Sequence, residues 1–153
     1  MKKISIDQIK DFRSQTGVSV MECKKALEEA RGDSKKAKEI LRKLGALMLE
    51  KKQGKTAKEG RVESYIHLTG KIGATVVLFC ETDFVARTQD FKNLCHELAM
   101  QVAAMNPKDT KELLSQPYIR DITKTVGDFL TEEVAKLGEK VEVGEFRRFE
   151  ITK

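Results

Sequence analysis

The sequence contains no tryptophan, and aromatic residues occupy only 6% of its 153 positions. A hydrophobic core must therefore be built mainly from aliphatic side chains. The sequence also lacks any apolar run approaching the ~20 residues that a membrane-spanning helix needs. Two lysines near the N-terminus precede a charged amphipathic segment and not the apolar centre of a signal peptide. We therefore expect no membrane partner and a cytoplasmic location.

Cysteine and histidine are also scarce, with three and two residues respectively. Cys23, Cys80 and Cys95 are odd in number and lack paired spacing, so a disulfide framework is not expected and a reducing compartment is favoured. No Cys-x-x-Cys pair occurs, and His67 and His96 stand isolated, so the spacing of metal ligands is missing. We expect no metal site and no cofactor.

Hydrophobic residues make up 40% of the chain and charged residues 35%, which indicates a globular protein. The formal net charge of +5 is modestly basic. Such a charge is compatible with an acidic protein partner and with nucleic acid, and it does not distinguish between them.

Apolar residues recur at helical spacing in three segments between residues 5 and 45. Ser5 with Gln8, and Ser19 with Glu22, fit capping boxes that open the first two helices. Gly45 is expected to begin the exit from the third helix. The core of this unit is predicted to hold Ile6, Ile9, Phe12, Val20, Cys23, Leu27, Ala30, Ala37, Ile40, Leu41 and Leu44. We therefore predict a separate three-helix domain over residues 1–50, a size that can fold alone.

Residues 50–61 are densely charged and nearly free of apolar side chains. We interpret residues 51–60 as a linker. The alternative is an arm that binds nucleic acid, because the five basic residues of this stretch could contact phosphates. No aromatic residue is interleaved to stack on bases, which disfavours the arm.

Residues 61–153 predict an α+β core, a small three-stranded antiparallel sheet packed with helices. Residues 61–80 form a hairpin in which Val62, Ser64 and Ile66 share an apolar face. The second strand is apolar on both faces and should be central. A second apolar face, including Tyr65, Val77 and Phe79, is expected to lie exposed in a single chain. Helices are predicted over residues 88–105, over 111–116, and from 119 to 137 before Gly138, and the third strand is predicted over 145–152.

Thr82, Asp83, Phe84 and Val85 lie where the second strand gives way to the helix over residues 88–105. Such connections normally run over the surface. A core accepts Phe and avoids Asp, so a carboxylate beside a phenyl ring here indicates a contact with something outside the chain. The alternative is that Phe84 folds back into the core while Asp83 caps a turn, since buried Phe is the ordinary case.

No pattern of an active site is present. Residues 70–73 lack both the glycine spacing and the Lys-Ser/Thr end of a P-loop. No Ser, His and Asp arrangement carries a nucleophile signature, and the carboxylates are scattered over polar helix faces. We do not expect an enzyme.

Three blocks resemble one known family. ETDFVA at residues 81–86 is closely similar to a signature of elongation factor Ts, the guanine-nucleotide exchange factor for the GTPase EF-Tu. TGVSVMECKKAL at residues 16–27 looks like the N-terminal signature of that family, which usually has Gly or Ala where Ser19 stands. KTVG at residues 124–127 with RRFE at 147–150 is similar to its C-terminal end. A short motif alone is weak, whereas three in family order are specific.

The resemblance implies an exchange factor that binds EF-Tu, in both its GDP-bound and its nucleotide-free state, and promotes GDP release. It implies a ubiquitin-associated-like (UBA-like) N-terminal module. The loop of residues 82–85 is then expected near the Mg²⁺ end of the partner's nucleotide site, with Phe84 inserted between apolar side chains and Asp83 disturbing the polar network around the metal. The residues expected to hold the partner from the N-terminal module are Val18, Val20, Met21, Lys24 and Lys25.

The chain is shorter than family members that carry two similar core subdomains and an inserted helical hairpin. The short form implies that a second copy supplies the missing half, so a homodimer with packed sheets is expected. The competing hypothesis is a small basic protein that binds RNA or DNA. Binding that weakens steeply with salt would identify the latter.

Overall fold

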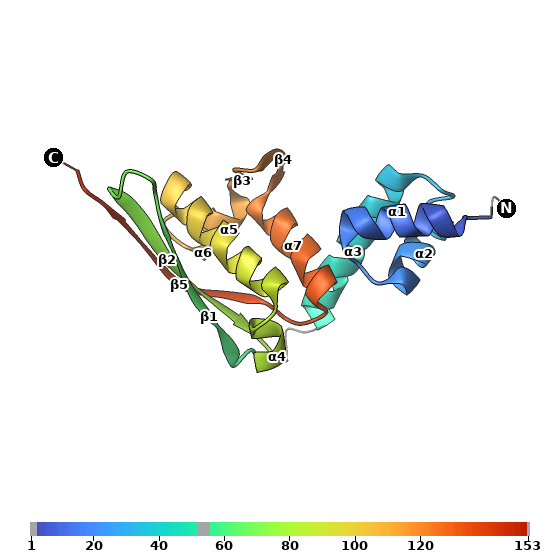
Figure 1. Ribbon diagram of the computed structural model, residues 1–153, viewed down its shortest axis with the longest axis horizontal. Coiled ribbons are helices and arrows are strands. Elements are labelled where there is room, and N and C mark those ends of the chain that lie inside the picture. The colour runs from blue at the N-terminus through green and yellow to red at the C-terminus, as the bar shows by residue number, and fades with distance from the viewer. Residues whose placement is uncertain (1–2, 52–55, 153) are drawn as a thin grey trace.

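The computed structural model describes residues 3–51 and 56–152. Figure 1 shows three helices at the N-terminal end of an elongated molecule and, at the other end, a sheet covered on one face by helices. This mixed arrangement agrees with the predicted α+β class. The helices are α1 (Ile6–Thr16), α2 (Val20–Glu29), α3 (Ser34–Lys51), α4 (Asp83–Ala86), α5 (Gln89–Met105), α6 (Thr110–Ser115) and α7 (Val126–Leu137). The strands are β1 (Glu59–Ile66), β2 (Ile72–Cys80), β3 (Pro117–Tyr118), β4 (Asp121–Thr125) and β5 (Glu142–Glu150).

The three N-terminal helices enclose a small hydrophobic core of their own. It contains Phe12, Val18, Cys23, Ala26, Leu27, Ala30, Ala37 and Leu41. The capping box of Ser5 and Gln8 is present, and Ser19 caps α2 by accepting from the N–H of Glu22. Two predicted core residues were placed wrongly, because Ile6 is 72% exposed and Val20 is 49% exposed. An α-helix turns about 100° per residue, so a side chain three positions before a buried one points about 60° away from it. This offset brings Ile6 and Val20 to the surface.

Helix α3 does not end at Gly45 as predicted but continues to Lys51. Four residues of the predicted linker, 52–55, lie outside the described residues, and β1 begins at Glu59. Helix α3 packs against α7, and an ion pair joins Arg42 to Glu132 at 2.9 Å. A Cβ at Gly45 would lie 2.7 Å from the backbone oxygen of Thr131. Glycine is therefore needed here for close helix packing and not as a helix stop.

Replacing Gly45 by leucine should lower the free energy of unfolding by about 2–3 kcal/mol, the upper part of the usual range of about 1–3 kcal/mol for overpacking, because the added atoms meet the backbone of α7. The loss exceeds the gain in helix propensity that any residue offers over glycine, about 1 kcal/mol. Urea unfolding at fixed protein concentration measures the effect. Ala46→Leu is the matched control, since Ala46 is exposed one position further along α3. Equal stability of the two variants would contradict the close packing.

The sheet has the order β1-β2-β5 with both pairings antiparallel, so the predicted central strand is confirmed. The β1 faces are the reverse of those predicted: Val62 is 63% exposed and Ile66 65% exposed, while Arg61, Glu63 and Tyr65 point toward the helices. Arg61 and Glu63 form an ion pair at 3.0 Å on that side, which satisfies their charges where apolar residues were expected. Strand β5 begins at Glu142, three residues before the predicted start, and contains an irregularity opposite β2.

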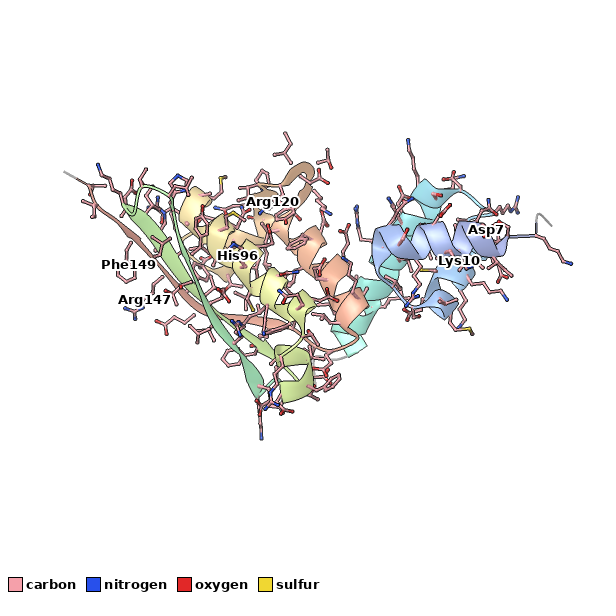
Figure 2. The ribbon with its side chains drawn as sticks, viewed as in Figure 1. Asp7, Lys10, His96, Arg120, Arg147 and Phe149 are labelled. Atoms are coloured by element: carbon pink, nitrogen blue, oxygen red, sulfur yellow. The ribbon has the colours of Figure 1, made fainter. Side chains whose placement is uncertain are left out.

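Among residues 3–51 and 56–152, no helix covers the side of the sheet that faces away from α5 and α7 (Figure 1). Figure 2 shows Phe149 and Arg147 projecting from β5 on this side. We call it the outer face, and its apolar members are Val62, Ile66, Val77, Phe79 and Phe149. Tyr65 was predicted for this face and lies instead on the helix side, where it packs against the main core. Its hydroxyl is 3.1 Å from the Nδ1 of His67.

The helix predicted from residue 119 begins only at Val126, and a two-stranded hairpin of β3 and β4 precedes it. Thr125 and Asp128 form a capping box that sets this start. The buried side chain of Gln101 holds the hairpin: its amide nitrogen donates to the Pro117 carbonyl at 3.0 Å, and its carbonyl accepts from the N–H of Ile119 at 3.0 Å. The apolar residues 119, 122 and 126 have helical spacing, and this spacing led to the wrong prediction of a helix from residue 119.

The main core combines the helix side of the sheet with α5 and α7, and it includes two of the three cysteines. All three cysteines are free and buried. Burial raises the pKa of the Cys80 thiol to about 11, aided by the nearby Glu139 carboxylate, and burial with Glu63 raises the pKa of Cys95 to about 12. Both thiols therefore stay protonated in the folded chain well above the ordinary value of 9.0.

At pH 8 the Cys80 and Cys95 thiols of the native chain should react with a disulfide reagent at least about 100-fold more slowly than in denaturant, because a pKa raised by two units reduces the thiolate fraction by that factor. Unfolded thiols ionise near pH 9, before the folded ones, so the free energy of unfolding should also fall as the pH rises above 9. Absorbance of the released thiolate measures the reaction. Three thiols that react rapidly in the native chain would contradict the buried placement.

Candidate functional site

Residues 82–85, predicted as a loop, form the start of a one-turn helix, α4. Thr82 caps it: the hydroxyl accepts from the N–H of Val85 at 3.3 Å, and the backbone of Thr82 remains extended. The carbonyl of Thr82 accepts from the N–H of Ala86 at 3.3 Å. Thr88 then caps α5, so only a short bend separates the two helices. Threonine is a favoured N-cap residue, so Thr82 itself is a local signal for the start of α4.

Phe84 projects from α4 into solvent, with 79% of its surface exposed. It does not fold back into the core, so the alternative placement of this side chain is wrong. Asp83 is also exposed and forms an ion pair with Arg87 at 3.2 Å. Such an exposed pair adds little stability. The α4 turn, residues 82–87, therefore presents a phenyl ring and a carboxylate on the surface.

The underside of the α4 turn is anchored in the main core. Val85 is only 8% exposed and Ala86 9% exposed. The Cys80 thiol donates to the carbonyl of Thr82 at 3.2 Å, and the Thr88 hydroxyl donates to the carbonyl of Val85 at 2.7 Å. The side chain of Val85 is thus unavailable to a partner, and it serves to hold the turn on the protein.

A second carboxylate reaches the α4 turn from a distant part of the chain. Glu139, just after α7, accepts hydrogen bonds from the N–H groups of Glu81 and Thr82 and from the hydroxyl of Thr82. Glu139 was not among the residues predicted for the site. Its one local feature is that it follows Gly138, the residue that ends α7. That feature does not indicate a contact with Thr82, 57 residues earlier in the chain.

The residues predicted to hold a partner from the N-terminal module lie around the start of α2. Met21 is 65% exposed, and Lys24 and Lys25 are exposed as well. Val20, although expected in the core, is available at the surface. Val18 is only 4% exposed and belongs to the small core. Figure 1 shows α2 and α4 in different parts of the molecule, so the two candidate contact regions are separate.

A cavity of about 440 Å³ lies between α3, α7 and the β3–β4 hairpin. Its lining charges are largely neutralised within the chain. Glu132 pairs with both Arg42 and Lys124, and Glu133 pairs with Lys136. Across residues 3–51 and 56–152, no group of three or more His, Cys, Asp or Glu side chains is placed to hold a metal ion. In the same residues no helix has the length and apolar character needed to cross a membrane.

An exposed aromatic side chain on a backbone fixed by hydrogen bonds is typical of a contact with another protein. Comparison with known proteins identifies the kind of protein concerned. The family model described as Elongation factor TS matches residues 81–153. The elongation factor Ts of Thermotoga maritima is 43% identical over 192 aligned positions, which cover 97% of this chain and 96% of the relative. That of Moorella thermoacetica is 40% identical over 193 positions, covering 97% and 95%.

The chain therefore belongs to the elongation factor Ts family, a family of translation elongation factors. The alignment with the Thermotoga protein spans 192 positions, more than the 153 residues of this chain, so the relative has internal residues that this chain lacks. The match nevertheless includes almost all of both proteins. The family assignment thus rests on the whole chain and not on the ETDFVA motif alone.

Proposed function

We propose that this chain is a guanine-nucleotide exchange factor that binds EF-Tu and accelerates its release of GDP. The observation that carries the proposal is Phe84, an apolar side chain 79% exposed on a turn that the core anchors from below. Family membership supplies the partner. A protein of this function works in the cytoplasm, changes an affinity, and makes or breaks no covalent bond.

The mechanism follows from the way a GTPase holds its nucleotide, through Mg²⁺ and through backbone N–H groups around the phosphates. In the proposal, the α4 turn enters the surface of EF-Tu near the Mg²⁺ end of that site. Phe84 inserts between apolar side chains and displaces them, while Asp83 disturbs the polar network around the metal. GDP thereby loses contacts with EF-Tu, whereas the nucleotide-free complex has no such contacts to lose. The factor therefore binds the nucleotide-free state more tightly, and the same coupling lowers the affinity for GDP.

The N-terminal helices provide a second contact in this proposal. We assign residues 1–50 to a UBA-like domain, 51–60 to the linker and 61–153 to the core domain that carries α4. Val20 and Met21 offer apolar surface to the partner, and Lys24 and Lys25 offer charge. The buried Val18 and Val85 act from within by fixing the backbone beside these contacts.

A homodimer completes the proposal. The outer face carries half-buried Val77 and Phe79 beside exposed Val62, Ile66 and Phe149. An apolar surface of this kind is typical of an interface. A second copy, placed by a two-fold axis, covers it with an identical face.

Release of a fluorescent GDP analogue from EF-Tu tests the function. The release rate, followed by stopped flow with an excess of unlabelled GDP, should rise with the concentration of the chain and then saturate. A release rate that is independent of the chain would reject the proposal. The alternative, a nucleic-acid-binding protein, predicts instead an RNA affinity that falls steeply with salt.

Asp83→Ala should reduce the maximal GDP-release rate less than Phe84→Ala does. The Asp83 carboxylate is exposed and already paired with Arg87, whereas binding energy concentrates in apolar anchors that become buried. We expect a loss of up to about fivefold for Asp83→Ala, corresponding to the roughly 1 kcal/mol of an exposed polar contact. Stopped-flow traces of both variants give the order, and a larger loss for Asp83→Ala would show that charge, not the phenyl ring, is dominant.

A further inference from the structure

Glu139 stands immediately after the end of α7. Gly138 ends that helix in the left-handed conformation, with φ 71°, and its N–H donates to the carbonyl of Val134. A residue with a side chain rarely adopts this conformation without strain. The reversal after α7 directs the chain back toward the end of β2, where α4 begins.

The carboxylate of Glu139 accepts three hydrogen bonds from this neighbouring segment. One oxygen accepts from the N–H of Glu81 at 3.1 Å and from the N–H of Thr82 at 3.0 Å. The other accepts from the hydroxyl of Thr82 at 2.6 Å. Hydrogen bonds to an ionised acceptor are about twice as strong as neutral ones. One side chain thus fixes both the backbone and the side chain of the residue that caps α4.

A contact in the opposite direction completes the arrangement. A carboxylate oxygen of Glu81 accepts from the backbone N–H of Lys140 at 2.7 Å. Each glutamate therefore binds the backbone of the segment that carries the other. We call this pair of contacts the Glu81–Glu139 clamp. It joins the end of β2 to the end of α7, next to the α4 turn.

We propose that Glu139 is a positioning residue for the contact that Phe84 makes with EF-Tu. The inference rests on the proposed function, because it assigns Glu139 to the same site. The Thr82 hydroxyl donates to Glu139 while it accepts from the N–H of Val85. Donation to a carboxylate polarises the hydroxyl and strengthens it as an acceptor, so Glu139 acts on α4 through Thr82. The exposed ring of Phe84 is then presented in one direction.

Fixing that direction before binding matters for the rate of exchange. An exposed side chain that has to be ordered during association loses conformational freedom at that step, whereas a preorganised one does not. Displacement of groups at the partner's nucleotide site also depends on orientation. Loss of the clamp should therefore slow GDP release within the complex without preventing the N-terminal module from binding.

Glu139→Gln is the principal test variant. It keeps the shape of the side chain but replaces one acceptor oxygen by an NH₂ group, which cannot accept. Hydrogen exchange of backbone amides, followed by NMR on the full chain, should show the N–H groups of Glu81 and Thr82 exchanging at least about tenfold faster, because a neutral amide oxygen accepts more weakly than the carboxylate oxygen that accepts from both of them. Glu142→Gln is the matched control: Glu142 lies three residues further along, is exposed and pairs only loosely with Lys140, at 3.8 Å. It should leave both amides unchanged.

The kinetic readout separates positioning from general destabilisation. Glu139→Gln should lower the maximal GDP-release rate at least about tenfold, corresponding to the same weakened hydrogen bonds, while the concentration of factor for half-maximal rate stays within about twofold. Thr82→Val should behave alike, and Thr82→Ser, which keeps the hydroxyl, should retain the rate. The double variant of Glu139→Gln and Thr82→Val should lose no more than either single variant, because the two residues act through one contact.

The outcomes distinguish this inference from the proposed function. Phe84→Ala is measured in the same series. If Phe84→Ala slows release and Glu139→Gln keeps both the full rate and the slow amide exchange, the positioning role is overturned and the function stands. Additive losses in the double variant, or a normal rate with fast amide exchange, also overturn it. If Phe84→Ala releases GDP as fast as the unaltered chain, the proposed function itself fails.

Discussion

Phe84→Ala leaves the fold intact and removes most of the exchange activity; this is the largest effect we expect. Its side chain is 79% exposed, so truncation opens no cavity. A buried phenylalanine would cost about 3–5 kcal/mol on the same change. As a central anchor at a partner, by contrast, it should contribute about 2 kcal/mol or more, which slows GDP release roughly 30-fold or more.

Two measurements on the same samples separate these effects. Thermal unfolding should show little change in the melting temperature, while stopped-flow GDP release shows the loss. Leu68→Ala is the matched control, because Leu68 is an apolar side chain 98% exposed in the turn between β1 and β2. That variant should keep both stability and rate. A large drop in melting temperature for Phe84→Ala, or equal rates for the two variants, would contradict the assignment of Phe84.

The second large effect that we expect concerns the oligomeric state, measured as the molecular mass in solution. Light scattering under reducing conditions should give twice the 17.3 kDa of one chain at micromolar concentration. In the proposed dimer the outer face supplies the contact, and no disulfide is needed because the three cysteines are buried and free. Phe149→Asp should give the monomer mass, since it places a carboxylate on the apolar face that the proposed dimer covers. Burying an unpaired charge costs several kcal/mol, so the dissociation constant should rise at least about 100-fold.

Ile122→Asp provides the control for this test. Ile122 is 80% exposed on β4, which belongs to the separate two-stranded sheet. The same change of charge there should leave the dimer mass unaltered. A monomer for the unaltered chain at micromolar concentration, or a dimer for Phe149→Asp, would show that the outer face is not the interface.

Local signals were sufficient to predict most of the helices and the strand order. The apolar stripe of α5, its end before Asn106, and the stop of α7 at Gly138 each follow from side chains within one turn of the feature. The central place of β2 follows from its apolar residues on both faces. The separation of exposed Asp83 and Phe84 from the core was also foreseeable, because a strand-to-helix connection rarely buries such a pair.

Features that depend on distant contacts were not predictable in this way. The orientation of β1 was predicted wrongly because its helix side is filled by the Arg61–Glu63 ion pair and Tyr65, while its apolar residues face outward. The β3–β4 hairpin depends on hydrogen bonds from Gln101, about sixteen residues earlier in the chain. Periodicity describes one segment at a time, so it contains no information on either partner.

The candidate site also contains some residues that could be predicted from the local sequence and others that depend on distant contacts. The exposed groups of the α4 turn were named from the sequence, whereas the groups that fix them were not. Val85 was expected at the contact and is buried beneath it. Glu139 holds Thr82 across 57 residues of chain and has no recognisable local pattern. The exposure of Asp83 and Phe84 could therefore be predicted from the local sequence, while the groups that hold them in place depend on the fold.

The affinity of the chain for EF-Tu, measured with and without bound GDP, tests the central claim most directly. An exchange factor must bind the nucleotide-free state more tightly, and the ratio of the two dissociation constants equals the factor by which it weakens GDP binding. Isothermal titration of EF-Tu freed of nucleotide, and of EF-Tu saturated with GDP and Mg²⁺, gives both constants. We predict tighter binding to the nucleotide-free protein by at least about tenfold, within the usual range of such coupling. Equal affinity for the two states would contradict the account, because a ligand that binds both states equally cannot shift the equilibrium between them.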